Sequence, residues 1–236
     1  MNRDAPVIPD ETELLRSLAP LEGARLLELG CGKADFARRL LERTPVASIA
    51  ALKVDKRQHE KNVASAPSKG LEFHYGGAQE IPFPDASFDG VLMMKSLHHV
   101  PGEFLDRALA EVRRVLKPGG WLYCSEPVFA GEYNDILKLF HDERAVRQAA
   151  REALDRAGSA GVLEPVEQRE FLLPRDFRDY DDFVEKVVKV THTDHAYSEA
   201  VAAEVRSRFE KYQKPGGARF MAPMRVDFMR RPSAEG

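Results

Sequence analysis

The sequence has few of the features that mark exported, membrane-spanning or nucleic-acid-binding proteins. Its 236 residues include only two cysteines, which argues against a disulfide framework and fits a reducing cytoplasm. No apolar run approaches the roughly 20 residues that a membrane helix needs, and the first residues lack a signal-peptide pattern. The formal net charge is -3, without the basic excess typical of nucleic-acid partners. We therefore expect a cytoplasmic protein with no membrane span and no nucleic-acid partner.

What the sequence does contain is an alternation of short apolar runs with helical patterns. The expected strands are residues 24–29, 47–54, 71–75, 88–94 and 120–126, and the expected helices between them are 34–43, 56–66 and 103–116. Such alternation is typical of βαβ units around a parallel sheet. It predicts an α/β fold with a doubly wound, mostly parallel sheet.

Beyond Glu126 the pattern becomes mainly helical. We expect one domain over residues 1–232, whose parts are a core at 21–127, a mainly helical cap at 128–216 and a terminal strand at 217–232, followed by a tail at 233–236. Within the cap, a strand-like run at 164–173 precedes helical patterns near 176–190 and 197–213. We expect this segment to form a cap over the sheet's carboxyl edge.

The turn after the first strand carries the first functional signal. Gly30 and Gly32 permit positive φ and close backbone approach, and the helix that starts near Ala34 directs free N–H groups toward the turn. An anionic group is favoured there. Position 35 is Asp, so the G-x-G-x-x-G dinucleotide fingerprint is absent, as is a phosphate-binding loop. A tight turn without any ligand is the alternative interpretation.

Acidic residues end the first two expected strands. Glu28 precedes the glycine turn, and Asp55 follows the second strand. Ligands of open α/β sheets bind at the carboxyl ends of the strands, where a carboxylate can accept hydrogen bonds from both hydroxyls of a ribose. The alternative is that Asp55 only caps the helix that begins at Lys56.

Four segments at ordinary spacing resemble the successive motifs of one enzyme family. They are ELGCGKA at 28–34, VD at 54–55, GGAQEIPFPDASFDGVLMMKSLHHV at 76–100 and EVRRVLKPGGWLYCSEP at 111–127. Together they resemble class I S-adenosylmethionine-dependent methyltransferases, especially the small-molecule branch with the ubiquinone and menaquinone methyltransferases. The resemblance covers residues 21–127 and implies a seven-stranded Rossmann-like sheet with the last strand antiparallel. It also implies S-adenosylmethionine as cofactor, S-adenosylhomocysteine as product and a small-molecule methyl acceptor.

The resemblance also assigns roles to individual positions. It places the turn residues Glu28, Gly30, Cys31 and Gly32 at the methionine end of the cofactor and Asp55 at the ribose. It places Ala78 and Gln79 by the adenine, and Lys95 to His98 by the sulfonium and the acceptor.

Three residues, His98, His99 and Lys95, are the main candidates for the chemistry itself, and Glu126 is an alternative. His98 or His99 could act as a base, with Glu126 as an alternative, although a structural histidine at a helix start is the simpler interpretation of either. Lys95 could bind an anionic acceptor or a carboxylate-bearing variant of the cofactor. The simpler interpretation is that the lysines of this region reach solvent or pair with acids.

Two departures from the family pattern bear on function. The acid that often precedes the adenine contact is Gly77 here, so one hydrogen bond to the adenine amino group is missing. The second departure is a group of lysines, Lys33, Lys53 and Lys95, near the place expected for the sulfonium cation. Because of these two departures, the alternative is a catalytically inactive, cofactor-binding pseudo-methyltransferase. DNA methylation is disfavoured, because no N-P-P-Y-type segment follows the fourth strand. We expect no metal, since the HTDH segment at 192–195 is only a weak ligand pattern.

Overall fold

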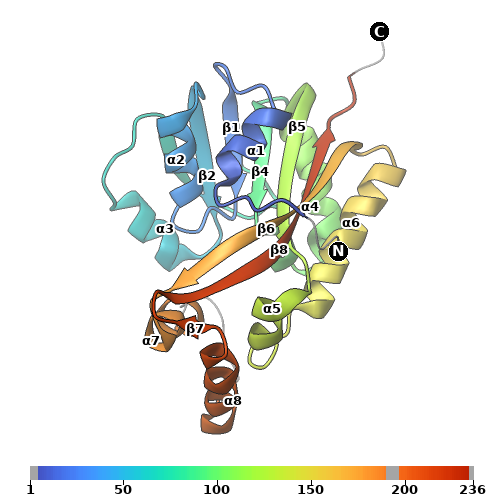
Figure 1. Ribbon diagram of the computed structural model, residues 1–236. Helices are drawn as coiled ribbons and strands as arrows, with labels where there is room; N and C mark the ends of the chain where they lie inside the picture. The colour runs from blue at the N-terminus through green and yellow to red at the C-terminus, as the bar shows by residue number, and fades with distance from the viewer. Residues whose placement is uncertain (1–4, 190–196, 234–236) are drawn as a thin grey trace. The chain divides into compact units, whose positions relative to one another are not determined.

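The computed structural model describes residues 5–189 and 197–233, which belong to two compact units (Figure 1). The sheet unit comprises Asp10–Glu126, Val146–Arg169 and Arg225–Gly236. The small unit comprises Met1–Pro9, Pro127–Ala145 and Glu170–Met224. Each unit is therefore built from three separate stretches of the chain.

The sheet unit contains the doubly wound sheet that the sequence predicts. Its strands are β1 (Arg25–Leu29), β2 (Ser48–Lys53), β3 (Leu71–Tyr75), β4 (Phe88–Met94), β5 (Leu116–Pro127), β6 (Glu164–Phe177) and β8 (Gly217–Arg230), where β6 and β8 also extend into the small unit. The order is β3-β2-β1-β4-β5-β8-β6, and a short eighth strand, β7 (Gln213–Lys214), pairs with β8. Because the strand order reverses between β1 and β4, the carboxyl ends of these two strands mark the ligand-binding point of the fold.

Strand directions agree with the predicted sheet. Strands β1 to β5 pair in parallel. Near the start of β5, the Gly119 N–H donates to the Arg231 carbonyl, and the Arg231 N–H donates to the Gly120 carbonyl. The beginning of β5 thus lies beside the end of β8, so β8 is antiparallel to β5.

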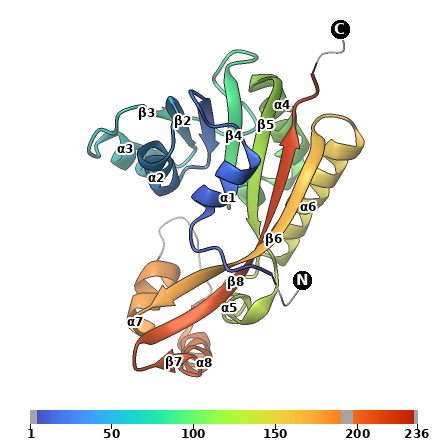
Figure 2. The ribbon, with the colours of Figure 1, turned by 45° about the horizontal axis from the view of Figure 1, so that its top comes forward.

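Helices cover both faces of this sheet (Figure 2). They are α1 (Glu11–Leu18), α2 (Asp35–Arg43), α3 (Lys56–Val63), α4 (Leu105–Val115) and α6 (Arg144–Ser159), with short 3-10 turns η1 (Leu97–His99) and η2 (Gly102–Phe104) after β4. Helices α4 and α6 bury Leu109, Val112, Ala153 and Leu154 in a core shared with the strands. Helix α1 lies over the opposite face in both views. No helix in the described part of the chain is long and apolar enough to cross a membrane.

The centre of the sheet is adjusted to one large side chain. Trp121 of β5 is the only tryptophan of the sequence and is buried opposite Gly90 of β4. A Cβ atom at Gly90 would lie 2.3 Å from the indole ring. Only glycine at position 90 leaves room for this ring.

The small unit has its own aromatic core. Helices α5 (Gly131–Leu137), α7 (Tyr180–Phe183) and α8 (Glu199–Glu210) and the π-helical turn η3 (Val184–Val188) accompany the ends of β6 and β8. Phe177, Phe183, Phe209 and Phe220 are buried together in this unit, and their rings meet mostly edge-on or tilted, with centroids 5.3 to 6.1 Å apart. These aromatic contacts join β6, α7, α8 and β8 within the unit.

The structure departs from the sequence-based expectations in three places. The stretch 146–169 groups with the sheet unit, because α6 buries its alanine and leucine face against the strands. The helix expected near 176–190 contains only α7 and η3 in its described part. Helix α1 was not predicted. The HTDH segment lies outside the described residues.

Candidate functional site

The glycine turn between β1 and α2 combines a tight contact with an open space. Gly30 has φ 73° and Gly32 has φ 56°. A Cβ atom at Gly30 would lie 2.6 Å from Ser96 Cβ, whereas a Cβ atom at Gly32 would meet no atom within 4 Å. Ser96 closes the contact by donating from Oγ to the Leu29 carbonyl at 2.7 Å. The turn is therefore packed on the side of the β4 loop and open beside Gly32.

The start of α2 leaves backbone donors at this turn. Ala34 adopts the left-handed conformation at the N-cap and makes no side-chain capping hydrogen bond. The first N–H groups of a helix have no intrahelical acceptor. The local geometry can thus accept an anionic or polar ligand group, as the sequence predicts.

A second helix supports the turn from behind. Asn62 of α3 is buried and donates from Nδ2 to the Gly32 carbonyl at 2.9 Å. Its own Oδ1 accepts from Gln58 Nε2 at 2.8 Å. Cys31 is buried in the same turn, and burial raises the pKa of its thiol to about 12. Cys31 thus contributes apolar packing and backbone to the turn, and its thiol stays protonated.

Glu28, close to the carboxyl end of β1, is the most unusual ionisable group near the glycine turn. It is 2% exposed, and its Oε2 has no hydrogen-bond partner among the residues that the structure describes. Burial raises the pKa of Glu28 to about 8, although Lys95 partly opposes that effect. A buried carboxyl oxygen without a donor is costly, so a ligand N–H or ammonium group at this place would relieve the cost.

Asp55 has the capping role that the alternative interpretation gave it. It is the N-cap of α3, and its Oδ1 accepts from the Gln58 N–H at 3.1 Å. An ionised carboxylate has about four acceptor positions. One capping hydrogen bond is therefore compatible with the predicted ribose contact, which stays a prediction.

Lys95 follows β4 and is held by residues from two other elements, β5 and α1. Its backbone is left-handed, with φ 56°, and its N–H donates to the Ser125 carbonyl at 2.7 Å. Its Nζ lies 3.4 Å from Oε1 of Glu11, a buried residue of α1. The Tyr123 hydroxyl also donates to Glu11 Oε2, at a distance of 3.3 Å. Glu11 thus partly neutralises the lysine that the sequence places near a sulfonium.

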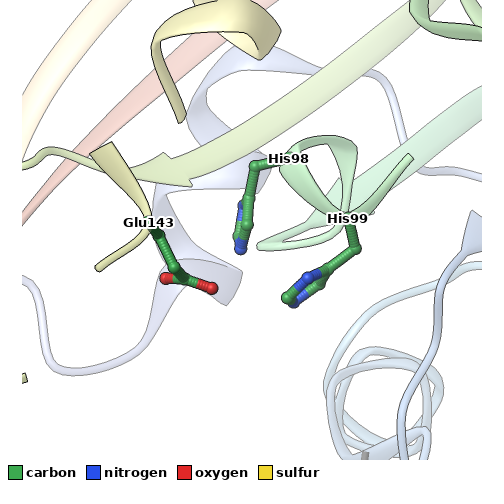
Figure 3. Close-up of side chains that lie close together, drawn as sticks. All are labelled: His98, His99 and Glu143. Atoms are coloured by element: carbon green, nitrogen blue, oxygen red, sulfur yellow. The ribbon is translucent and has the colours of Figure 1, made fainter. Parts of the chain in front are cut away.

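The two candidate histidines, His98 and His99, follow one another in η1 (Figure 3). Their environments differ. His98 is 5% exposed, and its Nδ1 forms a hydrogen bond with Oε2 of Glu126. Oε1 of Glu126 accepts from the N–H groups of Ser96 at 3.0 Å and Leu97 at 2.8 Å. His99 follows with its ring centroid 4.1 Å from that of His98 and is exposed. Because Glu126 is committed to three donors, it orients His98 and is a poor candidate for the base itself.

The predicted adenine segment between β3 and β4 is fixed from α4. The Ile81 N–H donates to Glu111 Oε2 at 2.9 Å, and Arg114 donates to the Ile81 and Phe83 carbonyls at 2.9 and 2.8 Å. Ala78 and Gln79 lie shortly before these hydrogen-bonded residues in the chain and are half-buried. Their contact with adenine stays a prediction.

Sequence reasoning missed two residues of this edge. Glu11 was overlooked because α1 was not predicted, although Asp10 at its N-cap, with Glu13 three residues later, is a helix-start signal. Asn62 carries no such signal, because its contact with Gly32 depends on how α3 packs against the turn.

The fold and this edge define a class of protein before any comparison: a doubly wound α/β domain with a glycine turn and two strand-terminal acids at its switch point. Residues 27–124 match the model of a methyltransferase domain family. This match covers less than half of the 236 residues. It supports the resemblance to S-adenosylmethionine-dependent methyltransferases and the cofactor that the sequence predicts, and the predicted fold class is confirmed.

Two curated relatives and one solved structure extend this result. The chain is 35% identical over 116 residues to 27-O-demethylrifamycin SV methyltransferase of Amycolatopsis mediterranei, which covers 47% of this chain and 42% of the relative. It is 38% identical over 109 residues to demethylmenaquinone methyltransferase of Bacillus velezensis, which covers 44% of this chain and 46% of the relative. The matches thus span less than half of either relative. The structure of the [4+2]-cyclase SpnF is 26% identical with a TM-score of 0.60, and covers 94% of this chain and 80% of its own.

Proposed function

We propose that the whole chain transfers the methyl group of S-adenosylmethionine to a small molecule by in-line displacement. The observation that carries the proposal is the β1–α2 turn, which is open beside Gly32 and follows the buried, unpartnered carboxyl of Glu28. When bound, the cofactor supplies an electrophilic methyl group on a cationic sulfur, which leaves as the neutral thioether of S-adenosylhomocysteine. The protein's task is then to position the acceptor and exclude water, and positioning can lower such a barrier by roughly 7–11 kcal/mol.

The residues of the edge fit the parts of this cofactor. Glu28, Gly30 and Gly32 would hold the methionine end, where an amino group satisfies the orphaned Glu28 oxygen. Asp55 would accept hydrogen bonds from the ribose hydroxyls while it caps α3. Ala78 would lie against the adenine. The backbone three residues further on is held in place, because the Ile81 N–H donates to Glu111.

His98 is the best candidate for a general base when the acceptor carries a proton. Its Nδ1 is engaged by Glu126, so in the neutral ring Nδ1 carries the proton and Nε2 is the proton acceptor. In this role His98 would take the acceptor's proton as the acceptor atom bonds to the methyl carbon. Glu126 would be a positioning residue, because it holds the ring and the two backbone N–H groups of the preceding turn.

Lys95 supports an anionic acceptor within the same proposal. Its side chain is 39% exposed, so it can turn from Glu11 toward a ligand carboxylate or phenolate. We expect Lys95→Met to raise the acceptor's KM at least tenfold while the Kd of S-adenosylhomocysteine changes less than twofold. The exposed Lys33 gives the control variant Lys33→Met. An unchanged acceptor KM would show that Lys95 only pairs with Glu11.

Calorimetric titration with S-adenosylmethionine and S-adenosylhomocysteine tests the proposed cofactor site. We expect micromolar binding by the wild type and a loss of at least tenfold for Asp55→Ala, because a charged acceptor of two hydroxyls is removed. Asp55→Ser separates the two roles, since serine still caps α3 but carries no charge. Asp179→Ala removes the N-cap of α7 and controls for the loss of a cap.

The outcomes separate binding from catalysis. Full affinity in Asp55→Ser would contradict the ribose contact. Binding without product, in a mass-spectrometric screen of hydroxylated and carboxylated acceptors, would favour a role other than methyl transfer. The likeness to a [4+2]-cyclase gives that outcome a concrete precedent.

A further inference from the structure

The segment between β3 and β4 has an unusual side-chain arrangement around Gly77. The Glu80 N–H donates to the Gly77 carbonyl at 3.3 Å, and the two residues form a β-bridge. The side chain of Gln79 folds back over Gly77. A Cβ atom at position 77 would lie 2.5 Å from Gln79 Oε1, 2.9 Å from Nε2 and 3.0 Å from Cδ. The Gln79 amide thus occupies the space that a side chain at position 77 would need.

This amide is presented by a rigid piece of backbone. Glu111 and Arg114 of α4 bond the main chain of Ile81 and Phe83 directly after it, and Ile81 is buried. Within the described ranges no protein group is hydrogen-bonded to the Gln79 side chain, which is half-buried. An amide with a donor, an acceptor and no protein partner, carried by a backbone segment that α4 holds in place, is suited to read a ligand edge.

The Gln79 amide is uncharged, whereas an acidic residue at position 77 would place a negative charge here. A carboxylate at position 77 could only accept hydrogen bonds, whereas the amide of Gln79 both accepts through Oε1 and donates through Nε2. A side chain at position 77 would meet the end of the Gln79 side chain, which would then have to turn away. Glycine at 77 therefore leaves this place to the Gln79 amide.

We propose that the Gln79 side-chain amide reads position 6 of the cofactor's purine ring. This inference rests on the proposed function. Oε1 accepts a hydrogen bond from the 6-amino group of an adenine, and after rotation of the amide Nε2 donates to the 6-oxo group of a hypoxanthine. The site therefore tolerates both an adenosyl and an inosyl ligand, which a carboxylate would not.

Equilibrium binding of two nucleosides tests this role without any acceptor. Calorimetry gives the Kd of S-adenosylhomocysteine and of S-inosylhomocysteine for the wild type, Gln79→Ala and Gln79→Glu. We expect the wild type to bind the two within about tenfold, Gln79→Ala to weaken both about tenfold, and Gln79→Glu to keep the adenosyl ligand but reject the inosyl one more than tenfold. Gln148→Ala, on the surface of α6, is the control variant.

A rescue variant guards against a merely structural effect. Gly77→Asp combined with Gln79→Ala removes the collision and installs an acid, so it should recover the affinity for S-adenosylhomocysteine but not for S-inosylhomocysteine. Wild-type binding with unchanged Kd values in the Gln79 variants overturns this inference alone. Failure of the folded wild type to bind either nucleoside overturns the proposed function together with it.

Discussion

At the scale of single residues, the buried carboxyl of Glu28 makes the stability of the protein depend on pH. It is buried, its Oε2 has no hydrogen-bond donor in the part of the chain that the structure describes, and its pKa is raised from 4.5 to about 8 by burial. Lys95 and Arg39 oppose this effect electrostatically and Asp35 adds to it. The folded protein therefore keeps a proton on Glu28 over a range in which the unfolded chain has released it.

The sign of the resulting pH dependence follows directly. Between pH 4.5 and about 8 the folded state binds more protons at Glu28 than the unfolded state, so its free energy of unfolding falls as pH rises, by at most about 1.4 kcal/mol per pH unit. We expect Glu28→Gln to remove this contribution. Urea unfolding of both proteins at pH 5, 6.5 and 8 measures it, and equal slopes of stability against pH would contradict the buried-acid explanation.

Residues whose roles depend on local pattern were predictable, and residues whose roles depend on packing were not. Gly30, Gly32 and Asp55 stand at the ends of clear apolar runs, and the structure places them at the carboxyl edge of β1 and β2. Asn62 and Glu11 act across the fold, over sequence distances that no periodicity records. The partnership of Glu126 with His98 was likewise invisible, although both residues were singled out.

At the scale of elements, the β1–α2 turn offers a matched pair of glycines. Both have positive φ, so alanine at either costs about 1–2 kcal/mol of backbone strain. Alanine at Gly30 also collides with Ser96, whereas alanine at Gly32 points into open space. We expect Gly30→Ala to destabilise by about 1–3 kcal/mol more than Gly32→Ala, as measured by urea unfolding.

Cofactor binding should separate the same two variants differently. Gly32→Ala fills space that the proposed methionine end needs, so we expect S-adenosylhomocysteine to bind at least tenfold more weakly to this variant although it stays folded. Equal stability of the two variants would show that Ser96 moves aside. Unchanged binding by Gly32→Ala would move the ligand away from the turn.

Elements were predicted well where apolar residues follow one clear period. The five predicted strands of the first half and the helices between them are confirmed, since each has an apolar run or face bounded by glycine, proline or a polar cap. Residues 176–190 looked like one helix, yet after α7 the chain widens into the π-helical turn η3. The sequence pattern does not distinguish a π-helical turn from a continued α-helix.

At the scale of the whole molecule, the two compact units do not follow the order of the chain. The sheet unit gathers three stretches of sequence, and the small unit gathers three others. A linear division into a core, a cap and a terminal strand cannot represent this, because β6 and β8 each contribute residues to both units. All residues proposed for the cofactor lie in the sheet unit, while the acceptor's identity is left to experiment.

The burial of Trp121 against Gly90 gives this protein an internal optical reporter. Its indole is the only one in the chain and belongs to the sheet unit, whereas the aromatic core of the small unit consists of phenylalanine and tyrosine. Emission excited at the red edge of protein absorption therefore comes from the sheet alone. Melting of the sheet can be followed by fluorescence in the intact chain without any label, and circular dichroism then records the sum of both units.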